Sequence, residues 1–333
     1  MQEKPASDSG ESGPGSSARS RVRKVTIDAD QAGQRIDNFL RRELPGVPKG
    51  RVYRLLRRGE VRVNSGRVRA EYKLQQGDEV RIPPARIRPD GPPPSRKLAD
   101  NILDCVIYED KRLMVLDKPS GVAVHGGSGI SHGIIELLRH ARPELRDLAL
   151  VHRLDRETSG CLVLAKRRSA LRELHARFRD GQVEKNYLAL VLGDWQLGEQ
   201  LIDAPLYVQH RKNGERHVVV SETGKPAQTR VRLSRTFGLY SLLQCTPLTG
   251  RTHQIRVHLQ HAGHPIVGDD RYGDEEANRH AKKLGLPRLF LHAQSIAFAD
   301  DSGNEQHFTA PLADDLEHFL TGGVVEAQRQ RKK

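Results

Sequence analysis

The run from His152 to Gly160 constrains this chain more than any other segment, because it sets an aspartate between two arginines in a turn that joins two apolar segments. Residues 148–151 before it and 162–165 after it have the composition of short buried strands, and Thr158, Ser159 and Gly160 are typical turn formers. We therefore expect Asp155 on a loop held by a rigid sheet, a common position for catalytic groups.

An ordinary solvated ion pair between Asp155 and Arg153 or Arg156 is the alternative interpretation of this turn. The nine consecutive residues HRLDRETSG, however, resemble the signature of the pseudouridine synthases of the RluA family. In that family the aspartate of this motif is the essential catalytic residue, which the resemblance carries over to Asp155. It also implies that His152 binds the substrate and that Arg153 fills the space vacated by a flipped base.

The charge of the chain favours a polyanionic partner. Its 333 residues include 55 Lys and Arg against 42 Asp and Glu, a net charge of +13, and such an excess is typical of proteins that bind nucleic acid. An acidic membrane surface is the alternative, but no apolar run approaches the roughly 18 residues that a spanning helix needs. We expect RNA as the partner and no membrane.

The three cysteines, Cys105, Cys161 and Cys245, are odd in number and widely spaced among apolar neighbours. They fit small core residues in a reducing compartment rather than a disulfide framework or a zinc site. The N-terminal segment has no apolar region of the signal-peptide type, so we expect a cytoplasmic protein.

Composition divides the chain into five parts. We expect a disordered tail rich in Ser and Gly over residues 1–22, a small basic domain over 23–88 and a Pro-rich linker over 89–100. A larger domain follows over 101–322, and a basic C-terminal tail covers 323–333.

The small domain is predicted to begin with two helices. Ile36, Phe39, Leu40 and Leu44 recur at helical spacing, and a second helix is expected over about 49–58 with Gly59 as its C-terminal cap. Short strands are expected near 61–64 and 77–82. This order resembles an S4 RNA-binding domain.

An arginine stripe lies opposite the apolar face of the second helix. A plain solvated face is the usual fate of such a charge pattern. The resemblance to S4 domains instead implies that these side chains and one on the next strand bind RNA: Arg51, Arg54, Arg58 and Arg62.

A second motif lies on a predicted central strand over 183–192, which is apolar on both faces. By pattern alone Tyr187 is a core residue whose hydroxyl needs a partner. The segment EKNYLALV is nevertheless similar to the Lys-x-Tyr-x-Ala-x-Val segment of the synthase family. The resemblance assigns Tyr187 to stacking on the target base and to proton transfer.

The third motif, GRTHQIRVH over residues 250–258, leads into a predicted helix. An isolated arginine at a helix start usually points to solvent. The match to the G-R-[ST]-H-Q-[IL]-R pattern of the family instead implies that Arg251 pairs with the catalytic carboxylate. A guanidinium suits that task because it remains charged and forks around two oxygens.

Other residues suggest further sites. The glycine-rich stretch that starts at His125 is a weak signal for phosphate binding, but it matches a passage that the family carries before its aspartate motif, which implies that His125 binds the substrate. A zinc site among His253, His258, His261 and His264 is disfavoured, because their spacing lacks a known ligand pattern and Gly263 should end the helix.

The resemblance covers nearly the whole chain and implies an α+β protein, in which a small S4-like domain is linked to a catalytic domain built on a mixed, largely antiparallel sheet with flanking helices. It implies an isomerase that converts uridines of 23S rRNA, free or in a large-subunit precursor, to pseudouridine without a cofactor or metal, as a monomer. Two alternatives are a non-catalytic S4-type rRNA-binding or assembly protein and an S4-bearing aminoacyl-tRNA synthetase. The latter is disfavoured, since no ATP-handling motif of that class occurs.

Overall fold

The structure, a computed structural model, describes residues 22–44, 47–84, 95–126, 132–145, 147–210, 216–324 and 327. The chain forms two compact units, Met1–Pro92 and Pro93–Lys333. Both mix helices and strands, which confirms the predicted α+β class. The disordered tail was predicted for residues that, apart from Val22, lie outside the described ones, as do half of the predicted linker and most of the glycine-rich stretch after His125.

The smaller unit packs two helices on a three-stranded antiparallel sheet of order β1-β3-β2. Its elements are β1 (Arg23–Thr26), α1 (Ile36–Glu43), α2 (Lys49–Arg57), β2 (Arg62–Val63) and β3 (Glu79–Ile82). The predicted apolar faces of both helices form the core, since Ile36, Phe39, Val52 and Leu56 are buried. Gly59 follows α2 with a φ of 67°, as a C-terminal cap requires.

The larger unit is built on a ten-stranded sheet. Its main path runs β4-β5-β7-β14-β8-β13-β12-β9, with β15 paired to β14 and β6 paired to β7. The strands of this sheet are β4 (Val106–Glu109), β5 (Leu113–Lys118), β6 (Ala149–Leu150), β7 (Ser159–Ala165), β8 (Glu184–Leu192), β9 (Gln200–Asp203), β12 (Gln228–Thr236), β13 (Tyr240–Pro247), β14 (Leu291–Ala299) and β15 (Glu305–Thr309). A separate hairpin joins β10 (Leu206–His210) to β11 (Arg216–Val220).

Helices flank this sheet, as predicted. They are α3 (Arg96–Leu103), α4 (Ile134–Ala141), the 3-10 turn η1 (Pro143–Leu145), α5 (Arg168–Arg179), α6 (Gln254–His261), α7 (Glu275–Lys283), α8 (Asp314–His318) and the π-turn η2 (Phe319–Gly323). All strand pairs of the large sheet are antiparallel except β7 with β14, so the predicted mixed, largely antiparallel sheet is confirmed.

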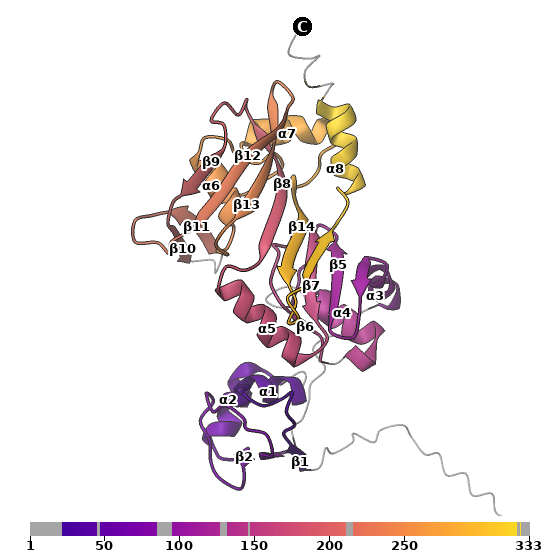
Figure 1. Ribbon diagram of the computed structural model, residues 1–333, viewed down its shortest axis with the longest axis vertical. Coiled ribbons are helices and arrows are strands. Elements are labelled where there is room, and N and C mark those ends of the chain that lie inside the picture. The colour runs from indigo at the N-terminus through magenta and orange to yellow at the C-terminus, as the bar shows by residue number, and fades with distance from the viewer. Residues whose placement is uncertain are drawn as a thin grey trace, which may run out of the picture. The chain divides into compact units, whose positions relative to one another are not determined.

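The parallel pair of β7 and β14 brings together segments that are far apart in the sequence, as Figure 1 shows. Gly160 makes their close approach possible. Its φ is 107°, and a Cβ added there would lie 2.2 Å from the carbonyl oxygen of Ala293. The glycine of the HRLDRETSG motif is therefore required for packing at the end of the turn that carries Asp155.

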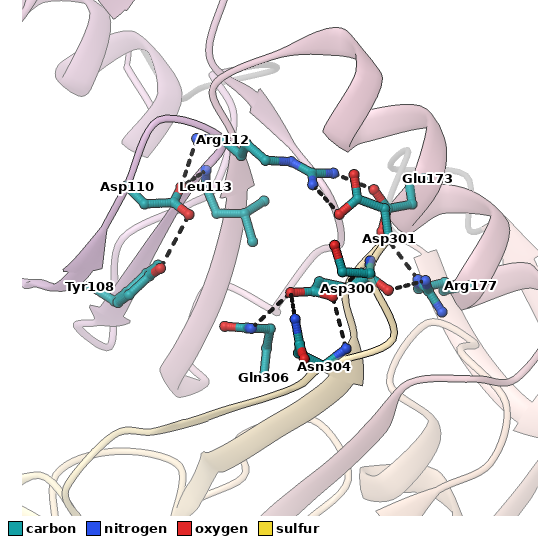
Figure 2. A network of polar contacts seen from close by, with 11 residues as sticks. Tyr108, Asp110, Arg112, Leu113, Glu173, Arg177, Asp300, Asp301, Asn304 and Gln306 are labelled. Carbon is teal, nitrogen blue, oxygen red and sulfur yellow. Dashed lines mark hydrogen bonds and ion pairs between the residues drawn. The ribbon is translucent and has the colours of Figure 1, made fainter.

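A polar network joins α5 to the β4–β5 and β14–β15 turns of the sheet (Figure 2). Arg112, which follows β4, contacts the carboxylates of Glu173 on α5 and Asp301 in the β14–β15 turn. Arg177 on the same helix donates to the backbone oxygen of Asp300 at 2.7 Å. These contacts fix the outer side of α5, whose other side presents His175 and Phe178 to the cleft described below.

Two predicted boundaries of the larger unit were wrong. The linker was predicted to extend to residue 100, but α3 starts at Arg96, because the Ser95 side chain caps it through Leu98 N and Ala99 is buried. The basic tail was predicted to start at residue 323, but Val324 and Ala327 are buried in the main core. Both errors arose where a polar sequence contains a few apolar residues that pack.

Among the described residues, no helix combines the length and apolar character that crossing a bilayer requires.

Candidate active site

The three sequence motifs meet at a cleft of about 520 Å³ in the larger unit. Asp155 reaches it from the loop between β6 and β7, Tyr187 from β8, and Arg251 from the segment before α6. Sites that enclose small ligands usually measure about 300–1,000 Å³. The cleft is therefore large enough to take one nucleotide of an extended chain.

The loop that carries Asp155 is held by the turn that follows β5. The fully buried Lys118 donates through Nζ to the backbone oxygen of Arg156 at 2.9 Å and to two carbonyls of its own turn. Ser120 Oγ donates to the backbone oxygen of Glu157 at 2.7 Å. Because these bonds satisfy the backbone directly after Asp155, the carboxylate is supported by a rigid frame.

Asp155 is paired with Arg256 of α6. Arg256 Nη1 lies 3.3 Å from Asp155 Oδ2, while its Nε and Nη2 each donate to the Asp269 carboxylate at 2.7 Å. Burial is the largest single influence and raises the pKa of Asp269, but the hydrogen bonds and charge of Arg256, together with the backbone N–H groups of Arg271 and Tyr272, outweigh it and lower the pKa below its usual value. The Asp269 carboxylate therefore orients the guanidinium that faces Asp155.

The prediction that Arg251 forms this ion pair was wrong. Arg251 lines the cleft, but its Nε donates to the backbone oxygen of Pro226 at 3.0 Å and its side chain is exposed. Gln254 Oε1 accepts from the Arg251 backbone N–H at 3.0 Å, so the chain turns before α6 begins. Arg256, inside the helix and within the same motif, is thereby directed at Asp155.

Tyr187 lies on a central strand, as predicted, and its ring lines the cleft. Its neighbour on β14 is Ala293, directly before a register shift at Ser295, and such bulges re-aim side chains near functional sites. Burial, and then the nearby Asp155 carboxylate, raise the pKa of Tyr187. The phenol is therefore neutral at physiological pH.

His152 also lines the cleft, but one of its ring nitrogens is used inside the protein. Its Nε2 accepts the Val163 N–H at 3.0 Å, and its ring stacks on Phe178 with centroids 5.3 Å apart. Burial, together with the nearby Lys185, lowers the pKa of His152 to about 3. The ring is neutral and rigid, so any contact with a substrate is made by its remaining edge or its face.

Basic side chains surround the part of the cleft near α5. Lys185 is half-buried, lies 5.8 Å from the Phe178 ring and has a pKa that burial lowers. Arg153, His125 and His175 are exposed along the same cleft. This arrangement favours a negatively charged chain over a neutral ligand.

The four arginines of the smaller unit that were predicted to bind RNA differ in their exposure and in their contacts. Arg54 and Arg58 are exposed, Arg51 is half-buried, and Arg58 lies 4.0 Å from Glu60. Arg62 donates to two backbone carbonyls at 3.2 and 3.0 Å, so its guanidinium stabilises the turn after α2. Arg51 and Arg54 make no ion pair within the described part of the chain, which leaves them available to a polyanion.

Sequence reasoning missed four residues around Asp155: Arg256, Asp269, His253 and Tyr272. Arg256 and His253 belong to the third motif. The sequence alone does not show at which residue the helix starts, so it could not decide whether Arg251 or Arg256 faces Asp155. Asp269 and Tyr272 carried no sequence signal, since they belong to a loop beyond α6. Of the histidines considered for zinc, His258 is buried between Thr229 Oγ1 and the backbone oxygen of Ala204.

Comparisons with known families agree with this site. The model of the RNA pseudouridylate synthase family matches residues 112–261, which contain all three motifs. The S4 domain model matches residues 34–80 of the smaller unit.

Curated relatives match almost the whole chain. Ribosomal large subunit pseudouridine synthase C of Escherichia coli (strain K12) is 52% identical over 305 residues, which cover 90% of this chain and 96% of the relative. The protein of the same name from Pasteurella multocida is 52% identical over 312 residues, covering 92% and 95% of the two chains.

Solved structures are similar as well. Human RNA pseudouridylate synthase domain containing 4 has a TM-score of 0.57 at 27% identity and covers 69% of this chain and 96% of its own. Human RNA pseudouridylate synthase domain containing 1 has a TM-score of 0.52 at 26% identity, with 62% and 82% covered.

Proposed function

Because this chain belongs to the RNA pseudouridylate synthase family, we propose that it isomerises uridines of 23S rRNA to pseudouridine with Asp155 as the catalytic residue. The large-subunit substrate is supported by the names of its curated relatives. Residues 32–40, 72–74 and 124–129 also resemble the synthase of that name. The substrate is the rRNA itself or a large-subunit precursor.

One observation carries the proposal: Asp155 faces a nucleotide-sized cleft that also contains Tyr187, with Arg256 beside its carboxylate. In this arrangement the buried Asp269 orients Arg256 toward the half-exposed Asp155. A non-catalytic RNA-binding protein has no need of it. Such pre-orientation is characteristic of catalytic groups.

The reaction breaks the bond between N1 of uracil and C1′ of ribose, rotates the base and joins C5 to C1′. The C5 proton is lost and N1 gains one, so the product is an isomer and no oxidant or energy source is consumed. Asp155 acts on the ribose by one of two routes: its oxygen adds to C1′ as N1 departs and is displaced when C5 attacks, or it removes a proton from C2′ as N1 departs, which forms a glycal, and returns that proton to C2′ when C5 attacks C1′.

The remaining residues hold the nucleotide. Removing a base from an RNA stack costs a few kcal/mol, and Arg153, exposed at the cleft, takes the place of the flipped base in our proposal. Tyr187 stacks on the released uracil, which has to stay in the cleft while it turns. His125 and the edge of His152 contact the same nucleotide.

Affinity for RNA comes in part from the S4 unit. Arg51, Arg54 and Arg58 on α2 contact phosphates, whereas Arg62 supports the turn beside them. The net charge of +13 adds long-range attraction to the RNA. We propose that the enzyme acts as a cytoplasmic monomer without a cofactor.

The test is carbodiimide-based mapping of pseudouridine in 23S rRNA from a strain that lacks this gene. Specific pseudouridines should be absent, should return with the wild-type protein, and should not return with the D155N variant. This variant should still fold and bind rRNA. If D155N restores modification, Asp155 is not the catalytic residue; if no pseudouridine disappears, 23S rRNA is not the substrate.

A further inference from the structure

His253 has a backbone conformation that is uncommon for a residue other than glycine. It precedes α6 with φ 53° and ψ 21°, in the left-handed region. The other non-glycine residues of the described chain with positive φ, Asn64 and Ser65, form a tight turn after β2. Strained backbones persist where surrounding contacts impose them, and they are frequent at functional sites. The contacts of the His253 ring therefore need an explanation.

One side of the ring contacts Tyr272. His253 Nδ1 lies 2.8 Å from the Tyr272 hydroxyl, which also accepts the Val218 N–H of β11 at 3.0 Å. Tyr272 is buried, with 1% of its surface exposed. If Nδ1 carried the proton, the hydroxyl would have to accept twice and its own proton would lack an acceptor, which is costly for a buried group. The phenol must donate to Nδ1.

The other side of the ring faces the catalytic carboxylate. His253 Nε2 lies 3.9 Å from Asp155 Oδ2, the oxygen that Arg256 Nη1 approaches to 3.3 Å. A bare nitrogen lone pair would repel this oxygen, so Nε2 has to carry the proton. Both ends of the ring thus require one tautomer, the neutral form protonated at Nε2.

We propose that His253 is a positioning residue for Asp155: Tyr272 holds its ring in the Nε2–H tautomer, so that this N–H and Arg256 both engage Oδ2 and leave Oδ1 to react with the ribose. The proposal rests on the proposed function. Within the described residues the Oδ1 atom has no hydrogen-bond partner. The gap of 3.9 Å closes when RNA binds, since catalytic hydrogen bonds often tighten only in the complex.

The charged surroundings agree with a neutral ring. The groups that face it are Asp155 on the β6–β7 loop, Arg256 on α6, and Asp269, Arg271 and Tyr272 on the loop after α6. Burial is the largest influence and lowers the pKa of His253, Asp155 opposes it, and the two arginines lower the pKa further. A neutral N–H donor can orient the Asp155 carboxylate without neutralising its charge. A positively charged imidazolium would stabilise that carboxylate in the ground state and make it less reactive toward the ribose.

The first experiment reads the tautomer directly. Long-range ¹H–¹⁵N spectra of the ¹⁵N-histidine-labelled protein, assigned with a His253 variant, should give a neutral ring protonated at Nε2 near pH 7. In the Y272F variant, which loses the donor to Nδ1, the ring should take up the second tautomer or a second proton. An Nδ1–H tautomer or an imidazolium in the wild-type protein would overturn the proposal.

The second experiment compares H253Q with H253N. The Gln amide can place an N–H near the position of Nε2, whereas the Asn amide reaches only the position of Nδ1. Asn tolerates the left-handed backbone better, so H253N should be at least as stable as H253Q. We expect the reverse order in catalysis: H253Q should retain kcat within about tenfold of wild type, and H253N should lose about a hundredfold, with unchanged Kd for rRNA.

Activity that follows stability, with H253N equal to or better than H253Q, would mean that His253 is only structural and would refute the proposal. The pH profile adds a third measurement: the acid limb of kcat should move to higher pH in Y272F, and an unchanged limb counts against the role of Tyr272. If the wild-type protein does not modify 23S rRNA, the substrate assignment fails instead, and the tautomer measurement still decides the state of His253.

Discussion

The two arginines of the third motif should respond very differently to substitution. Arg256 forms a fork with the buried Asp269 and reaches Asp155, whereas Arg251 donates to a backbone carbonyl from an exposed position. We therefore predict that R256M abolishes catalysis and destabilises the larger unit, while R251M lowers kcat by less than about tenfold and leaves stability nearly unchanged, within about 0.5 kcal/mol.

The magnitude for Arg256 follows from its two partners. The side chain of Asp269 is completely buried, and removing the partner of a buried charge costs about 3–5 kcal/mol. Across the 3.3 Å to Asp155, two unit charges attract each other by about 5 kcal/mol at an effective dielectric constant of about 20, before desolvation is subtracted. Even a third of that attraction, about 1.7 kcal/mol, would alter kcat more than tenfold if it orients Asp155.

A double-mutant cycle separates stability from catalysis. D269N keeps an oxygen for the backbone N–H groups of Arg271 and Tyr272 but removes the buried charge. Combined with R256M it should restore about 2–3 kcal/mol of the free energy of unfolding that R256M loses, as measured by urea denaturation. Turnover should stay absent, because Asp155 still lacks its guanidinium.

Catalysis is measured as tritium release from rRNA labelled at uracil C5, since the reaction expels this hydrogen. The assignment of Arg256 is refuted if R256M turns over normally, or if R251M loses activity as completely as R256M does. A stable R256M protein would in addition contradict the buried ion pair.

Three further predictions concern other parts of the molecule. The pKa of His152 is about 3 in the folded protein and about 6.5 when unfolded, so below pH 6.5 the unfolded chain takes up a proton first and the folded state loses stability. Between pH 6 and 4 this loss amounts to at most about 1.4 kcal/mol per pH unit. The H152Q variant has no such group, so its free energy of unfolding, measured by urea denaturation, should fall less steeply with acid than that of the wild type by up to this amount. Replacing Arg51 and Arg54 by Gln should reduce the salt dependence of rRNA binding by about one to two units of slope without changing the melting temperature; an unchanged slope would argue against phosphate contacts. G160A should cost about 3 kcal/mol or more, because its Cβ would collide with Ala293, while G181A, with a φ of 70° and open space around it, should cost only about 1 kcal/mol; equal losses would contradict the close approach of β7 and β14.

Local patterns were sufficient for much of the fold. The apolar spacing of residues 36–44 and 49–58 predicted α1 and α2, and the two-sided apolar run at 183–192 predicted β8 as a central strand. These features could be predicted because period and turn chemistry depend on neighbouring residues alone. The Ser95 cap and the burial of Val324 were missed, since one polar and a few apolar residues do not outweigh a Pro-rich or basic composition.

By itself the sequence determined the family, the two-unit organisation and the three segments that form the cleft, because each of these features depends on residues that are consecutive in the chain. Only the tertiary structure decided that Arg256, and not Arg251, faces Asp155, and that Tyr272 and Asp269 orient the groups around it. Which arginine points inward depends on where α6 begins, and that start is set by hydrogen bonds of Gln254 to the distant strand β12 as well as to its own turn. Partners that meet only through folding leave no pattern in the order of the residues.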